Sequence, residues 1–179
     1  FVATIPAAIF GLLFKDLINQ YFFNINNIQY LCFSYLFLAC VLVLTKNKIS
    51  EKYNNISFYF ALLIGLSQSL AIIPGISRSG ITIACALLLG INSKIATKFS
   101  FMLAIPILFF SFIASIFNNY SLINNSTMLV PLFFGFLSSF IVGYITIGFL
   151  VKLIEDKKLW YFSPYCIVVS ILVGVNYGL

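Results

Sequence analysis

The chain alternates long apolar runs with short polar breaks, and this pattern predicts a bundle of membrane-spanning helices. A helix needs about 20 consecutive apolar residues to cross a bilayer. Complete or partial runs of this kind predict spans at residues 1–14 (a partial span, ended by Lys15 and Asp16), 28–45, 99–117, 128–151 and 160–178. The pattern therefore predicts an all-α polytopic membrane protein, with residues 1–179 forming one integral membrane domain.

Residues 56–92 form another apolar region, which Pro74 and Gly75 break in the middle. The arm from Gly80 to Gly90 has only about 11 residues, too few to cross a bilayer as a helix. Non-helical backbone at membrane depth is tolerated only where protein buries it or where it lines a cavity. We therefore predict a re-entrant helix–loop–helix hairpin with its tip at residues 74–80.

The lysines test this arrangement. If the hairpin returns to its own side of the membrane, that side receives eight of the nine lysines, namely Lys46, Lys48, Lys52, Lys94, Lys98, Lys152, Lys157 and Lys158. The other side then receives only Lys15 and the uncharged loop 118–127. This asymmetry follows the positive-inside rule, whereas a crossing hairpin would place Lys152, Lys157 and Lys158 across the membrane from Lys46, Lys48 and Lys52. The distribution favours the re-entrant hairpin.

Composition agrees with a membrane protein, because 62% of the residues are hydrophobic and only 8% are charged, against about 25% charged in soluble domains. The net charge of +6 is scattered over short loops, which suits anionic lipid and gives no basic stripe for nucleic acid. The sequence has no histidine, the commonest general base and metal ligand. The cysteines lie in apolar runs without metal-ligand spacing, so we expect packing roles for Cys32, Cys40, Cys85 and Cys166.

The candidate chemistry centres on Arg78, the only arginine of the chain. An arginine at membrane depth costs about 2.5–3.5 kcal/mol on insertion scales, so it needs a partner or a water-filled cavity. Its guanidinium is a planar fork of donors that suits phosphate oxygens. Ser77 and Ser79 add hydroxyls on either side of it. These residue types together predict an oxyanion site at the hairpin tip.

Other residues near the tip fit the same chemistry. Thr82 adds a hydroxyl, and Gly75 and Gly80 let backbone N–H groups approach a ligand closely. If Gly80 opens the second half-helix, the positive end of that helix points at the same place. Gln68, in the apolar arm before the tip, would either hydrogen-bond across helices or line the cavity. The alternative for the arginine is a structural tie from the hairpin to a carboxylate or to backbone carbonyls.

The segment Pro-Gly-Ile-Ser-Arg-Ser-Gly-Ile-Thr-Ile at residues 74–83 resembles the second signature of the bacterial undecaprenyl-diphosphate phosphatases, the BacA/UppP family. The resemblance runs along the chain, and its further matches are Ile5-Pro6-Ala7-Ala8, residues 11–16, Gln68-Ser69-Leu70-Ala71 and residues 99–106. It implies hydrolysis of undecaprenyl diphosphate to undecaprenyl phosphate and inorganic phosphate in the bacterial cytoplasmic (inner) membrane. This reaction recycles the lipid carrier of peptidoglycan synthesis.

The family is built from two inverted repeats, each with a re-entrant hairpin, and this chain matches the second. The first repeat carries the proposed serine nucleophile, the histidine and the carboxylates for a divalent cation, Mg²⁺ or Ca²⁺. That motif is missing from this sequence. The resemblance therefore implies an N-terminally truncated chain, the C-terminal two-thirds of the family's length, without the metal ligands and inactive alone.

By the family pattern, Arg78 is the catalytic group on the diphosphate, assisted by Ser77 and Ser79. The substrate-binding candidates are the residues around them, namely Gly75, Gly80, Thr82 and Gln68. The expected partners are a polyprenyl diphosphate, the lipid bilayer and a second copy of the chain in a homodimer, with no nucleic acid.

Two other functions remain open. Broken helices that aim half-helix N-termini at an anion are also typical of transporters, so a transporter or flippase of a lipid phosphate or small anion is the alternative. A purely structural membrane segment is the third, and the polar tip argues against it.

Overall fold

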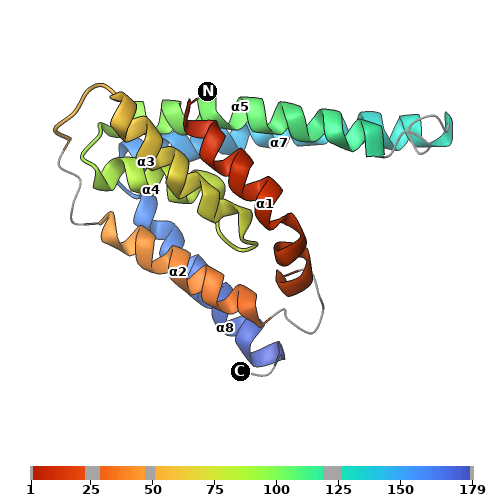
Figure 1. Ribbon diagram of the computed structural model, residues 1–179, viewed down its shortest axis with the longest axis horizontal. Helices are drawn as coiled ribbons and strands as arrows, with labels where there is room; N and C mark the ends of the chain where they lie inside the picture. The colour runs from red at the N-terminus through yellow and green to blue at the C-terminus, as the bar shows by residue number, and fades with distance from the viewer. Residues whose placement is uncertain (1, 23–28, 47–50, 119–125, 178–179) are drawn as a thin grey trace.

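The computed structural model describes residues 2–22, 29–46, 51–118 and 126–177. In this part of the chain the main elements are α1 (Ile5–Phe22), α2 (Tyr30–Leu44), α3 (Phe58–Ser69), α4 (Arg78–Leu88), α5 (Ser93–Asn118), α7 (Ser126–Glu155) and α8 (Phe162–Tyr177) (Figure 1). Short 3₁₀ turns occur at η1 (Val2–Thr4), η3 (Leu70–Ile72) and η4 (Leu159–Tyr161). The described residues contain no strand, only an isolated bridge between Tyr53 and Ile91. The predicted all-α fold is confirmed.

Three helices are long and apolar enough to cross a membrane: Ser93–Phe117, Met128–Glu155 and Leu159–Tyr177. They coincide with the predicted spans at 99–117, 128–151 and 160–178, apart from residue 178, which lies outside the described residues. α5 begins before its predicted span, and α7 continues beyond its own to Glu155. The chain is thus a polytopic membrane protein.

The two N-terminal helices differ from their predicted bounds. α1 continues through Lys15 and Asp16 to Phe22, because neither charged residue breaks a helix. The helix thus extends past the predicted partial span of residues 1–14, whose end at this charged pair stays a prediction. α2 has 15 residues inside the predicted span 28–45, and residues 1 and 28 of the predicted spans lie outside the described part of the chain.

The predicted hairpin consists of α3, η3 and α4, and it reverses direction at Pro74 and Gly75. Gly75 has φ +93°, a left-handed conformation that glycine adopts most easily. The two ends of the hairpin are hydrogen-bonded to each other. The N–H groups of Lys52 and Tyr53 donate to the Gly90 carbonyl at 2.9 and 3.0 Å, and the Asn92 N–H donates to the Tyr53 carbonyl at 2.9 Å. The chain therefore enters and leaves the hairpin at one place, as a re-entrant hairpin requires.

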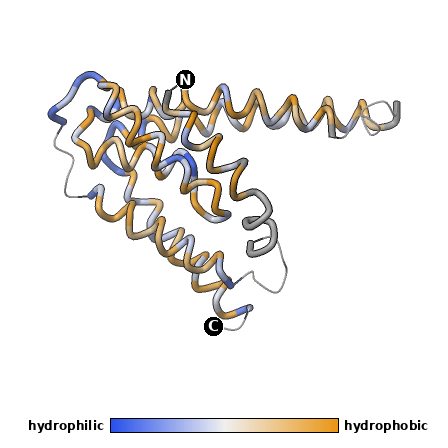
Figure 2. Tube along the Cα trace, viewed as in Figure 1, coloured by the Kyte–Doolittle hydropathy of each residue, from blue (hydrophilic) through white to orange (hydrophobic). Residues whose placement is uncertain are grey.

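The loops that carry lysines gather at this same end of the molecule. Lys46, after α2, places its Nζ atom 4.4 Å from the centre of the Trp160 ring, before α8. Glu51 links the loop before α3 to Ser93 at the start of α5 and to Lys157 after α7. Figure 2 shows a hydrophilic stretch in the loop that precedes α3. Lys48 and residues 119–125, which the lysine argument also uses, lie outside the described residues.

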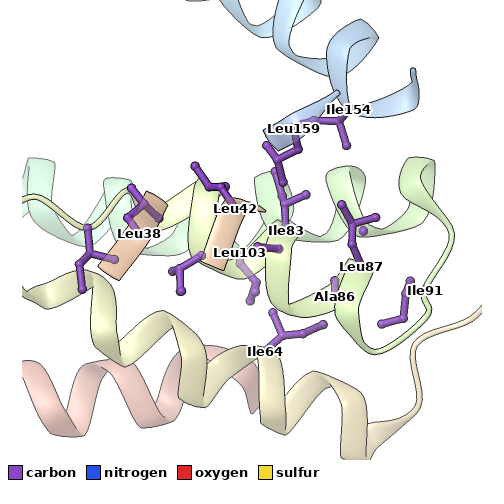
Figure 3. Close-up of a cluster of buried hydrophobic side chains, with 14 of the residues drawn as sticks. Leu38, Leu42, Ile64, Ile83, Ala86, Leu87, Ile91, Leu103, Ile154 and Leu159 are labelled. Carbon is purple, nitrogen blue, oxygen red and sulfur yellow. The ribbon is translucent and has the colours of Figure 1, made fainter. Parts of the chain in front are cut away.

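Apolar side chains of α2, α3 and α4 form the core around the hairpin. The core includes Leu42, Ile64, Ile83 and Leu87, and Ile154 and Leu159 from the α7–η4 region cover it on one side (Figure 3). α2 packs along α8, and α1 packs against α3. This arrangement surrounds α4 with other helices.

Cysteine side chains contribute unequally to this packing. Cys32 and Cys166 are buried, and the Cys32 Sγ atom lies 3.0 Å from the Ser170 Oγ atom between α2 and α8. Cys85 is half-buried, but Cys40 is exposed. The expected packing role within the chain is therefore wrong for Cys40, which lies on the outer face of α2.

Candidate anion site at the hairpin tip

The tip of the hairpin ends in the N-terminus of α4. The helix begins at Arg78, because the Ser77 hydroxyl caps it by accepting the Gly80 N–H at 3.2 Å. The helix therefore begins two residues before Gly80, the start considered from the sequence. The earlier start places Arg78 and Ser79 in the first turn, where the partial positive charge of a helix lies.

Arg78 forms a clasp with Gln68 across the hairpin. Its Nε and Nη2 atoms both donate to the Gln68 Oε1 atom, at 3.1 and 2.7 Å. Gln68 is only 2% exposed, whereas the arginine is half-buried. Of the two roles considered for Gln68, the structure shows a hydrogen bond between helices.

No carboxylate neutralises Arg78 within the described part of the chain. The two ion pairs found there join Lys157 to Glu51 and Lys158 to Asp156. The alternative of a structural tie to a carboxylate therefore finds no support among these residues. The guanidinium thus has no counter-charge among these residues, and at a half-buried position its attraction for an anion is stronger than in bulk water.

A pocket of about 630 Å³ lies next to the clasp. Its polar wall contains Ser77 and Ser79 together with Gly75 and Gly80, so four of the predicted site residues meet there. The rest of the wall is mainly apolar and comes from α2, α7 and α8. Arg78 does not line this pocket, because successive residues of a helix point about 100° apart. The tip therefore presents hydroxyls on one face and the guanidinium on another.

Thr82 is separate from both faces. Its side chain is 1% exposed, and its hydroxyl donates to the Arg78 carbonyl at 2.8 Å and lies 2.7 Å from the Ser100 Oγ atom on α5. This placement indicates an anchor between α4 and α5 rather than a contact with substrate. The partner residue Ser100 was missed from the sequence, although a serine within an apolar helix was the available signal.

The family model for the bacitracin resistance protein BacA matches residues 1–172 of the chain. The chain belongs to this family. Among its relatives, "Undecaprenyl-diphosphatase 2" of Bacillus thuringiensis (strain Al Hakam) is 38% identical over 172 residues, which cover 96% of this chain and 63% of the relative. "Undecaprenyl-diphosphatase" of Thermosipho africanus (strain TCF52B) is 40% identical over 171 residues, 96% of this chain and 65% of the relative. The enzyme of that name from Staphylococcus carnosus (strain TM300) is 36% identical over 183 residues, 98% of this chain and 60% of the relative.

The chain thus spans a little under two-thirds of the length of these BacA-family relatives. A divalent cation was expected from the resemblance. Among the described residues, no three His, Cys, Asp or Glu side chains come together, so these residues do not fit such an ion. The cation remains a prediction, with ligands outside the described part of this chain.

Glu51 is a further residue whose role the sequence did not reveal. Its carboxylate accepts hydrogen bonds from the Ser93 hydroxyl at 2.6 Å, from the Ser93 N–H at 3.3 Å and from the Asn92 side chain at 3.1 Å. The Ser93 hydroxyl is the main reason why the pKa of Glu51 lies below its ordinary value of 4.5. The expected role as a solvated loop charge is incomplete, since Glu51 ties the two ends of the hairpin together.

Proposed function

We propose that the complete protein hydrolyses undecaprenyl diphosphate with water to undecaprenyl phosphate and inorganic phosphate, and so recycles the lipid carrier of peptidoglycan synthesis. Membership of the BacA family and the names of the relatives support this reaction. The observation that carries it is the Arg78 guanidinium, held by a neutral amide at the end of a short helix in the interior of the bundle. An anion is the ligand that such an uncompensated charge attracts.

In this proposal, Arg78 binds oxygens of the diphosphate and stabilises the charge that develops on them during phosphoryl transfer. Ser77 and Ser79, which lie on the pocket face of the tip, would donate hydroxyl hydrogen bonds to other oxygens of a diphosphate that reaches round the tip from Arg78, and Gly75 and Gly80 keep the backbone open to it. The neighbouring pocket suits part of the prenyl chain, because most of its lining is apolar while Ser77 and Ser79 add hydroxyls to it. The site thus fits an amphiphilic phosphate ester.

We further propose the bacterial cytoplasmic membrane as the location, with the lysine-rich end of the bundle facing the cytoplasm. Mg²⁺ or Ca²⁺ would assist with ligands from outside the described residues. A homodimer is compatible with the exposed apolar face of α7, on which Phe133 is 61% exposed. The 179-residue chain alone is expected to be inactive.

The decisive variant is Arg78→Lys in the complete gene product, reconstituted in liposomes with undecaprenyl diphosphate and Mg²⁺ or Ca²⁺. We expect phosphate release to fall by about 100-fold or more, because an ammonium cannot reproduce the bidentate fork. The matched control is Lys94→Arg, which exchanges the same two residue types at an exposed position. Its rate of phosphate release should be near that of wild type. Near wild-type turnover of a correctly inserted Arg78→Lys protein would contradict the proposed role.

The same liposomes separate the enzyme from the transporter or flippase. Movement of intact lipid phosphate across the bilayer without phosphate release would favour transport. Release of phosphate into the medium favours hydrolysis.

A further inference from the structure

We propose that Gln68 is a positioning residue for Arg78, a neutral latch that fixes the guanidinium without neutralising it. The phosphate chemistry of the ligand rests on the proposed function, but the latch itself rests on the geometry of the clasp. Such a latch keeps the anion site both oriented and charged.

The clasp uses one edge of the guanidinium. An arginine side chain has five N–H donors, and the Gln68 Oε1 atom accepts from Nε and from Nη2 at 3.1 and 2.7 Å. The Nη1 group and the second hydrogen of Nη2 are left for a ligand. Two contacts to one acceptor also fix the plane of the guanidinium, so its remaining donors have a defined direction.

The orientation of the amide is determined by its partner. With Oε1 toward Arg78, this oxygen accepts from both Nε and Nη2 of the guanidinium. If the amide were flipped, its NH₂ group would face these N–H donors and no hydrogen bond could form. The consequence is that Gln68 Nε2 is buried without a hydrogen-bond partner. An unpaired buried amide nitrogen is destabilising, and a methionine of similar length would avoid it. The contact with Arg78 is therefore what accounts for an amide at this buried position.

The neutrality of the amide matters as much as its oxygen. A glutamate at position 68 would hold the guanidinium in a stronger, charge-assisted pair. It would also cancel the positive charge that attracts a phosphate. A glutamine provides the orientation and leaves the charge to the ligand.

Three variants of the complete gene product test the latch: Gln68→Glu, Gln68→Met and, as a matched control, Gln29→Glu at the start of α2, outside the site. The probe is inorganic pyrophosphate, with its affinity measured by calorimetry and the thermal stability of each variant measured in detergent. We expect Gln68→Glu to be as stable as wild type or more so, yet to bind pyrophosphate about tenfold more weakly or worse, a loss of about 1.4 kcal/mol. The Gln29→Glu control should leave affinity and stability unchanged.

In Gln68→Glu, pyrophosphate affinity should fall while thermal stability is kept or rises. This distinguishes a positioning role from a merely structural one, in which affinity and stability would fall together. Gln68→Met should also weaken pyrophosphate binding without loss of stability, because it releases the guanidinium and removes the orphaned nitrogen. In an Arg78→Lys background, neither change at position 68 should reduce the affinity by more than about twofold, within the range of independent sites.

Unchanged affinity in Gln68→Glu or Gln68→Met, or a loss of affinity that parallels a loss of stability, would overturn the latch. A complete protein that binds pyrophosphate through Arg78 but releases no phosphate would overturn the proposed function alone.

Discussion

The hairpin arm α4 and the long helix α7 are both apolar, yet they lie in opposite surroundings. Six of the 11 residues of α4 are buried, whereas the most apolar stretch of α7 is 0% buried within the chain. Figure 1 shows α7 running with α5 away from the hairpin, while α4 lies among other helices. Hydrophobicity alone does not tell whether a helix faces the protein or the lipid.

The two helices have different surroundings because they differ in the polar groups that are left without hydrogen-bond partners inside the helix. α7 has 30 residues and pairs its backbone groups internally, so its apolar side chains can face hydrocarbon without cost. α4 is short, begins with a charged residue and follows a non-helical turn at Pro74 and Gly75. Such irregular backbone must be covered by protein or line a cavity. The fold therefore places its polar, irregular segment in the interior and its regular segment at the periphery.

The largest expected difference is in the side of the membrane from which a membrane-impermeant thiol reagent labels the hairpin ends and the far end of α8. In a background with all four cysteines replaced by serine, we expect Lys52→Cys and Lys94→Cys to be labelled from the same side of the membrane, because the hairpin ends are hydrogen-bonded to each other. Asn176→Cys, at the far end of α8, should be labelled from the other side. Labelling of the two hairpin ends from opposite sides would refute a re-entrant hairpin.

A glycine pair tests the packing difference between interior and periphery. A Cβ atom at Gly65 would lie 2.4 Å from the Ala3 carbonyl oxygen, whereas one at Gly135 on α7 would meet nothing within 4 Å. We expect Gly65→Ala to destabilise the complete gene product by about 3 kcal/mol through overpacking of α3 against η1. Gly135→Ala should change the stability by less than about 1 kcal/mol. Unfolding in mixed micelles measures both, and equal effects would contradict the close approach.

Removing a hydroxyl from α4 or from α7 should give a smaller difference in the free energy of unfolding. Thr82→Val removes a buried hydroxyl and leaves Ser100 without it, so we expect a loss of about 2 kcal/mol in the free energy of unfolding. Ser138→Ala removes an exposed hydroxyl that bonds to the Gly135 carbonyl of its own helix, and it should cost less than about 0.5 kcal/mol. A Thr82→Val protein as stable as Ser138→Ala would show that the α4–α5 anchor contributes little.

Glu51→Gln should have the smallest effect, below about 1 kcal/mol, because Glu51 is a surface residue and solvent screens its ion pair with Lys157. The pKa of Glu51 is lowered in the folded state, so its charged form stabilises the fold above its ordinary pKa of 4.5, and this contribution is lost as the pH falls through the lowered value. The difference in unfolding midpoint between wild type and Glu51→Gln should therefore be present at neutral pH and disappear in acid, once the pH has fallen below the lowered pKa of Glu51. A difference that persists in acid would assign the effect to packing instead.

The sequence by itself determined the architecture and the centre of the chemistry. Long apolar runs specify helices because a bilayer offers no partners for backbone groups, and the Pro74–Gly75 break specifies the turn because these residues cannot continue a helix. A lone arginine among hydroxyls identified the candidate site, since a charge in apolar surroundings needs a partner or a ligand. These inferences depend on properties of single residues and of their near neighbours in the chain.

Only the tertiary structure decided which groups meet. Gln68 and Arg78 lie ten positions apart, and their clasp depends on how the hairpin closes. Thr82 was grouped with Ser77 and Ser79 from the sequence, but the rotation of α4 turns it toward Ser100. Glu51 reached Ser93 through the meeting of the hairpin ends. The physical reason is that the direction of a side chain depends on helix start and rotation, and these are set by packing with segments distant in the sequence.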